Sequence, residues 1–208
     1  MGAPGAALRS AWAASGQRRL RCDSGFAMIA SLPILIDDPN TSPWLEPLTA
    51  RLSIVLVHPQ IPPNTGNVAR LCAVTGTALH LIAPLGFRVT DKDLKRAGLD
   101  YWDKVHVRTW ESFEELCAEV PLEESKVHLF TGKVSPTSRG LWQAKFAPGD
   151  WLILGEEARG LPEEVLQRFP SRWVRVPMIR EPSARSLNLS TCTGIALYEA
   201  LRQCANDF

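Results

Sequence analysis

The stretch "RSLNLSTCTGIALYEALRQ", residues 185–203, changes character at its middle. Its second half places Ile195, Tyr198 and Leu201 on one face of an amphipathic helix. Its first half is rich in small hydrogen-bonding side chains, namely Ser186, Asn188, Ser190, Thr191 and Thr193. A polar segment therefore runs directly into a helix here, and two earlier regions of the chain show the same pattern.

Short apolar runs and helical patterns alternate from residue 53 onward. The runs typical of strands are 53–57, 78–82, 104–108, 127–131, 151–155 and 173–177. The helical patterns are 65–75, 91–97, 111–120, 162–169 and 189–203. This alternation predicts an α/β fold with a mostly parallel sheet and helices on both of its faces.

Residues 1–50 are rich in Ala, Ser, Gly and Pro and lack a regular period. We therefore predict a poorly structured N-terminal extension over 1–50 and one domain over 51–208. The first 36 residues contain four arginines and one acidic residue, a composition that also suits an organelle transit peptide. Without such a signal, the expected location is the cytoplasm.

The net charge of the 208 residues is +1, so no field of the whole protein attracts nucleic acid. Candidates for local basic patches are Lys92, Lys95, Arg96, Arg168, Arg172 and Arg175. The five cysteines are scattered without a C-x-x-C pair, a pattern that predicts reduced thiols and no metal site. No apolar run has the length that spans a bilayer.

The first polar loop, "HPQIPPNTGNVARLCAVTG" at 58–76, joins a predicted strand to a predicted helix. Asn64 or Thr65 is suited to cap that helix. Asn64, Asn67 and Arg70 recur every three residues, which predicts that they lie near one another on the helix. The G-x-G-x-x-G of a dinucleotide site is absent here. An ordinary capped helix with a solvated arginine is the structural alternative.

The second polar loop is "LGEEARGLPEEV" at 154–165, in which Gly155 and Gly160 bracket a tight turn. Glycines in such a turn let backbone groups approach a ligand closely. A phosphate loop is excluded, because no Lys-Ser/Thr pair follows Gly160 and two glutamates would repel phosphate. The turn either binds a neutral or cationic ligand or is purely structural.

The third polar loop is the beginning of the stretch quoted first together with its lead-in, "VRVPMIREPSA" at 174–184. Each of the three loops thus follows a strand and precedes a helix. Open α/β sheets bind ligands at the carboxyl ends of their strands. The three loops therefore predict one crevice at that edge.

In their order and amino-acid sequences the loops resemble the motifs of the SPOUT methyltransferases, a class with a deep C-terminal trefoil knot. The resemblance is strongest to the small TrmL type, which methylates the ribose 2′-hydroxyl of the wobble nucleotide of tRNA. It covers about residues 52–204. The segments that carry it are "IPPNTGNVARLCAVTG" (61–76), "GFRVTDKDLKRAGLDYW" (86–102), "LGEEARGLP" (154–162), "RVPM" (175–178) and "RSLNLS" (185–190).

This resemblance implies that S-adenosylmethionine binds between the knot loops. The residues implied to hold it are Phe130, Gly155, Val176, Met178, Ser186 and Leu187. The residues implied in catalysis are Arg70, Asn64, Ser186 and Asn188, and Glu157 and Arg159 are implied to support the substrate or a loop. Because a guanidinium is not readily deprotonated, we expect Arg70 to hold a phosphate or stabilise the developing alkoxide.

The resemblance also implies partners. The expected substrate is the anticodon stem-loop of tRNA, with leucine isoacceptors favoured. The expected assembly is a homodimer, with Leu71, Tyr198 and Leu201 as candidate contacts. Two alternatives stay open, namely a ribose methyltransferase for ribosomal RNA or another tRNA position, and a non-catalytic RNA-binding protein on the same scaffold. A Rossmann oxidoreductase ranks last, because its glycine fingerprint is missing.

Overall fold

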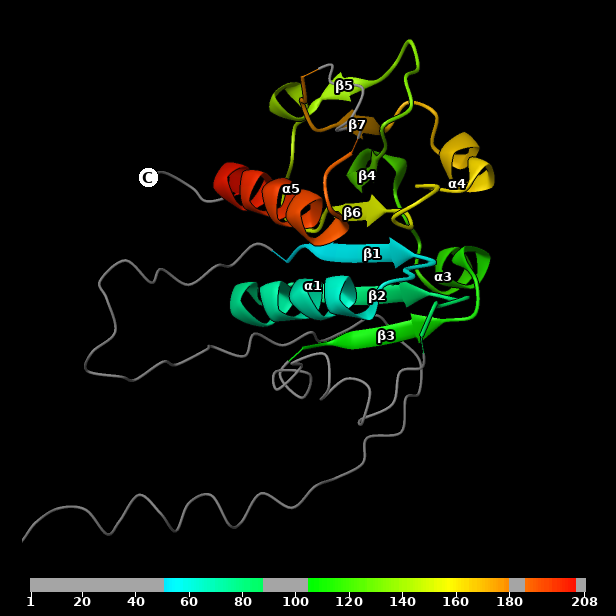
Figure 1. Cartoon of the computed structure of the whole chain (residues 1–208). Helices are drawn as coiled ribbons and strands as arrows, with labels where there is room; N and C mark the ends of the chain where they lie inside the picture. Colours follow the sequence, from blue (N-terminus) through cyan, green and yellow to red (C-terminus); the bar gives the residue numbers. More distant parts are fainter. Residues whose placement is uncertain (1–50, 88–104, 180–185, 205–208) are drawn as a thin grey trace, which may run out of the picture. The chain divides into compact units, whose positions relative to one another are not determined.

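Parallel strands form the centre of the structure, a computed structural model that describes residues 51–87, 105–179 and 186–204. The strands are β1 (Ser53–Val57), β2 (Ala78–Ile82), β3 (Val107–Trp110), β4 (Val127–Phe130), β5 (Arg139–Gly140), β6 (Trp151–Leu154) and β7 (Trp173–Arg175). Within the described residues they form one sheet in the order β3-β2-β1-β6-β4-β7-β5, and every pairing is parallel (Figure 1).

Helices cover both faces of this sheet. They are α1 (Pro62–Thr75), α3 (Phe113–Glu119), α4 (Glu163–Arg168) and α5 (Leu189–Cys204), with short 3₁₀ turns η2 (Glu124–Lys126) and η3 (Leu141–Gln143). In β1, Ile54 and Leu56 pack with α1 and α5, whereas Val55 and Val57 pack with α3 and α4. Alternate residues of one strand thus face two apolar layers, which is why the strand reads as a continuous apolar run. The predicted α/β fold is confirmed.

Helices α1 and α5 pack against one another over the same face (Figure 1). A Cβ added to Gly194 of α5 would lie 4.0 Å from Leu71 Cδ2 of α1, an ordinary van der Waals separation. Thr193 is completely buried, and its hydroxyl donates to the Leu189 carbonyl at 2.8 Å. The start of α5 therefore buries the hydroxyl of Thr193 without leaving it unpaired.

One predicted strand and one predicted helix begin three residues away from their expected positions. Strand β3 lies at Val107–Trp110 rather than at 104–108, because Trp110 is buried and its indole N–H donates to His80 Nδ1 at 3.1 Å. Helix α1 begins at Pro62 rather than at residue 65. Prolines suit the first helical turn, where no intrahelical N–H bond is needed.

The sequence pattern missed β5, whose two residues are too short to show a period. The strands predicted at 127–131, 151–155 and 173–177 end one or two residues earlier than expected. The predicted helix 91–97 and the predicted extension 1–50 lie outside the described residues. The predicted knot involves the connection from β7 to α5, of which residues 180–185 also lie outside them.

The order of the strands places a switch point between β1 and β6. From β1 the chain continues to β2 on one side, while β6 lies against β4 on the other side. The loops that follow β1 and β6 therefore leave the sheet next to each other. Such a point is where open parallel sheets form a ligand crevice.

Candidate functional site

The loop that follows β1 is held tightly against the loop that follows β2. His58 has a left-handed backbone conformation with φ 55°, and its N–H donates to the Ile82 carbonyl at 3.0 Å. The N–H of Gly86 donates to the Pro59 carbonyl at 2.9 Å. A Cβ on Gly86 would lie 2.5 Å from the Gln60 carbonyl oxygen, so only glycine permits this approach.

The loop that follows β6 folds back on itself in an equally tight turn. Gly160 has φ 72°, and its N–H donates to the Glu156 carbonyl at 2.9 Å. A Cβ on Gly155 would lie 2.0 Å from the carbonyl carbon of Gly160. Both glycines that the sequence singled out are therefore required by the backbone.

This turn presents the carboxylate of Glu157 to the start of α1. Glu157 accepts hydrogen bonds from the N–H of Gln60 at 3.0 Å and the N–H of Ile61 at 3.2 Å. Ile61 is the N-cap residue of α1 and offers no side-chain hydrogen bond of its own. The carboxylate thus supplies, from 96 residues away, the negative charge that a helix N-terminus favours.

Asn64 connects Glu157 to α5. Its Nδ2 donates to Glu157 Oε1 at 2.8 Å, and its Oδ1 accepts from Asn188 Nδ2 at 2.9 Å. Asn188 Oδ1 in turn accepts from the N–H of Ser190 at 2.9 Å and the N–H of Thr191 at 3.3 Å, and so caps α5. We call Glu157, Asn64 and Asn188 the three-loop network, because each comes from a different polar loop.

The orientation of both amides in the three-loop network follows from their partners. A carboxylate can only accept, so the amide nitrogen of Asn64 must face Glu157. Its oxygen then faces the nitrogen of Asn188, whose oxygen is left for the backbone N–H groups of α5. One charge therefore sets the direction of the whole chain of hydrogen bonds.

The prediction that Asn64 or Thr65 caps α1 is wrong. Both lie inside the first turn, because the helix begins at Pro62. Asn64 is 5% exposed and belongs to the three-loop network. Thr65 Oγ1 is buried without a hydrogen-bond partner among the described residues. What the sequence missed is that Ile61 has no cap of its own and takes a charged partner from a distant loop.

Asn67 and Arg70 lie farther along α1, and their side chains are exposed. Arg70 is six residues beyond Asn64, about 9 Å along the helix axis. The three residues at intervals of three thus divide into one buried and two exposed side chains. The three-loop network fixes the beginning of the helix that carries Arg70.

Three of the residues implied to hold a cofactor, Phe130, Gly155 and Val176, lie at or directly after the carboxyl ends of β4, β6 and β7. Phe130 pairs in register with Leu154 of β6 and with Val174 of β7, so the chain leaves all three strands at one level. The ring of Phe130 is buried and lies parallel to that of Phe146, with centroids 6.5 Å apart. Phe130 therefore offers its backbone rather than its ring to a ligand.

Apolar side chains remain open at this edge. Val176 is half-buried, Met178 is 44% exposed and Leu187 is 37% exposed, and Ser186 is exposed beside Leu187. A flat aromatic base would cover such apolar surface, whereas Gly155 is buried within its turn. These residues fit a bound nucleoside, as S-adenosylmethionine requires.

The remaining implied residue, Arg159, is 89% exposed at its side chain and pairs with Glu156 at 3.5 Å within its own turn. Within the part of the chain that the structure describes, it forms no hydrogen bond or ion pair with the three-loop network. Among these residues no group of three metal-ligating side chains occurs, and Cys72, Cys117, Cys192 and Cys204 are free thiols. No helix among them has both the length and the apolar character needed to cross a membrane.

Residues 51–198 match the model of the SpoU rRNA Methylase family. The chain belongs to this family.

Members of the family with known names are close in sequence. A tRNA (cytidine(34)-2′-O)-methyltransferase of Burkholderia ambifaria is 47% identical over 156 residues, covering 73% of this chain and 94% of the relative. A protein of the same name from Methylovorus glucosotrophus is 48% identical, covering 74% of this chain and 96% of the relative. A solved structure described by the 2-OH methylation of C/U34 on tRNA has a TM-score of 0.66 and 46% identity, covering 74% of this chain and 96% of that one.

Proposed function

We propose that this protein transfers a methyl group from S-adenosylmethionine to the ribose 2′-hydroxyl of nucleotide 34, a cytidine or modified uridine, in leucine tRNA. The observation that carries the proposal is the three-loop network, which ties the beginnings of α1 and α5 to the glycine turn. Support for the substrate comes from relatives near 47% identity that are named for this reaction.

The cofactor, when bound, supplies a methyl group on a positively charged sulfur, which is reactive without a metal. The apolar side chains of Val176, Met178 and Leu187 would hold its nucleoside, and Gly155 would shape the neighbouring turn. The protein then has to align the ribose oxygen and remove its proton.

Arg70 is assigned to the ribose. A guanidinium stays charged at neutral pH, so it acts as an electrostatic group rather than as a base. Its planar fork suits the phosphate beside the reacting ribose or the developing alkoxide. The three-loop network positions the helix that carries it, and Ser186 lies next to Leu187 where the ribose would enter.

Methyl transfer to leucine tRNA tests the proposal. Purified protein, S-adenosylmethionine and unmodified or natively modified leucine tRNA are incubated, and mass spectrometry locates the methylated nucleotide. The expected product is 2′-O-methylated nucleotide 34. A methyl group elsewhere in tRNA would contradict the assigned position.

Ribosomal RNA is the second candidate substrate, because the matching family model is described as an rRNA methylase. The same incubation with ribosomal RNA separates the two. Transfer to ribosomal RNA without transfer to tRNA would favour this alternative. Absence of transfer to every RNA in the presence of cofactor would favour the non-catalytic reading.

The proposed assembly is a homodimer formed through α1 and α5. Val74 of α1 and Ile195 and Tyr198 of α5 are large apolar side chains that expose 60%, 39% and 55% of their surfaces. The candidate contact Leu201 is excluded from this surface, since it is 4% exposed within the core. Leu71 is half-buried and packs on the same core. Sedimentation of the purified protein should give twice the mass of one chain. The proposed location is the cytoplasm.

A further inference from the structure

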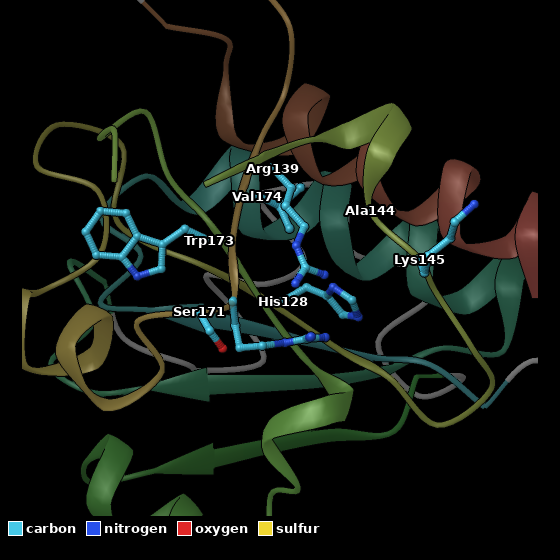
Figure 2. Close-up of a pocket in the computed structure, with 8 residues that line it drawn as sticks. His128, Arg139, Ala144, Lys145, Ser171, Trp173 and Val174 are labelled. Carbon is cyan, nitrogen blue, oxygen red and sulfur yellow. The ribbon is translucent and has the colours of Figure 1, made fainter. Parts of the chain in front are cut away.

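A pocket lies away from the loops of the candidate methyl-transfer site. Its charged and polar lining consists of His128, Arg139, Lys145, Ser171 and Arg172. Figure 2 shows the side chains of Arg139 and His128 extending toward the same space, with Lys145 to one side. Three of its lining side chains are cationic, which makes this a basic pocket.

Strand register explains why these side chains converge. Arg139 of β5 pairs with Val174 of β7, and Val174 pairs with Phe130 of β4. Paired residues share a face of the sheet, and His128 shares it with Phe130 because they are two positions apart. Arg139 and His128 therefore project from the same face, one strand apart from each other across β7.

The basic pocket lies at the C-terminal end of α5. Gln203 of α5 donates to the Ala144 carbonyl at 3.1 Å and accepts from the N–H of Phe146 at 3.0 Å, next to Lys145. The opposite end of α5 is capped by Asn188 of the three-loop network. A helix of 16 residues at about 1.5 Å per residue is about 24 Å long, so the pocket and the network are well separated.

The acidic groups near the basic pocket are already engaged. Asp150 Oδ2 accepts from His128 Nε2 at 2.7 Å and from the N–H of Ala147 at 2.9 Å. Glu124 Oε1 accepts from the hydroxyl of Ser171 at 2.6 Å. Within the described ranges neither Arg139 nor Lys145 takes part in an ion pair.

Arg172 is held in place with hydrogen-bonding capacity to spare. Its Nε donates to the Val127 carbonyl at 2.7 Å and one terminal nitrogen donates to the Ser125 carbonyl at 2.6 Å. Burial, and then the charge of Arg139, lower the pKa of Arg172, while Asp150 and Glu124 act in the opposite direction. Two guanidiniums that repel each other in a partly buried pocket are stabilised by an anion between them.

We propose that the basic pocket binds a phosphate group of the RNA substrate, several nucleotides away from the methylated ribose. Arginine forks match the oxygens of a phosphate, and Lys145 adds a point charge at the rim. The inference rests on the proposed function only in that the substrate is RNA. A local basic pocket of this kind would allow a protein with a net charge of only +1 to bind a polyanion.

The test measures binding of the full chain to fluorescently labelled total tRNA at several KCl concentrations. Arg139→Ala should weaken binding about three- to tenfold at 100 mM KCl and reduce the slope of log K against log salt by about 0.7 to 0.9, as loss of one phosphate contact predicts. Affinity for S-adenosylmethionine and kcat at saturating RNA should not change. Arg202→Ala is the matched control, because Arg202 is an exposed arginine already paired with Glu199.

Lys145→Ala is the second variant, with a smaller loss of affinity expected, and thermal unfolding checks that both variants fold. Wild-type tRNA affinity and salt slope in Arg139→Ala and Lys145→Ala would overturn the proposal. Loss of inorganic phosphate binding in Arg139→Ala, with tRNA binding intact, would assign the pocket to free phosphate and overturn the RNA assignment. Because total tRNA is used and binding is measured, weakened binding supports the pocket even if methylation occurs away from nucleotide 34.

Discussion

Replacing Glu157 with glutamine should loosen the junction of the three polar loops. Glutamine has the same shape, but one of its two terminal atoms is a donor. Glu157 faces donors on both oxygens, since Oε1 accepts from Ile61 and Asn64 and Oε2 accepts from Gln60. Whichever way the new amide turns, at least one N–H group meets another donor.

The magnitude follows from these three hydrogen bonds. A bond to a charged acceptor contributes about 1.5–3 kcal/mol net and a neutral one about 0.5–1.5 kcal/mol. Two bonds would be weakened and one lost, and the favourable charge at the N-terminus of α1 would disappear as well. Because the bonds to Gln60 and Ile61 are reached by water, we expect Glu157→Gln to lower the free energy of unfolding by about 2 kcal/mol, or roughly 4–8 °C in Tm.

Denaturant unfolding of Glu157→Gln, Asn64→Ala and the double variant measures whether the contact couples the loops. The two changes should be non-additive by about 1 kcal/mol, because the Asn64–Glu157 bond can be lost only once. Glu156→Gln is the control, since its partner Arg159 is almost fully exposed, and it should change stability by less than about 0.5 kcal/mol. Additive effects of Asn64→Ala and Glu157→Gln would refute the network as a unit.

Three further outcomes are expected. Burial, and then the charge of Arg108, lower the pKa of His80 from 6.5 to about 4, so the unfolded chain binds a proton that the folded chain does not. The free energy of unfolding should therefore fall by up to about 3 kcal/mol as pH drops from 6.5 to 4, and urea titrations of His80→Gln should lack this loss. Gly155→Ala places a Cβ 2.0 Å from backbone, so it should abolish cofactor binding in calorimetry or prevent folding, and normal binding would disprove the tight turn. A chain beginning at Thr49 is proposed to fold and to methylate RNA; loss of cofactor binding would show that the domain begins earlier.

The fold class was predictable because its signal is repeated. Apolar runs such as 53–57 and 151–154 form buried parallel strands. Their alternation with helices is compatible with few architectures other than a parallel α/β sheet. Short or weakly patterned elements were not predictable. The edge strand Arg139–Gly140 has only two residues, and the position of β3 depends on one tryptophan that reaches His80.

The candidate site was predictable as a set of loops but not as a set of contacts. The spacing of the glycines identified the turn around Gly155. The polar composition of the loops before two helices indicated Asn64 and Asn188 as candidate residues. The partner of the first helix was missed, since the sequence places Glu157 96 residues from Ile61. Local capping rules name only neighbours in the chain, whereas here a tertiary contact supplies the cap.

Arg70 provides the most direct test of the claim that this edge of the sheet is a methyl-transfer site. Tritiated methyl transfer to leucine tRNA is measured for wild type, Arg70→Ala and Arg70→Lys, alongside calorimetric binding of S-adenosylmethionine. We predict that Arg70→Ala abolishes transfer while cofactor affinity stays nearly unchanged, and partial activity in Arg70→Lys would indicate that the charge holds a phosphate. Wild-type transfer by Arg70→Ala would contradict the account.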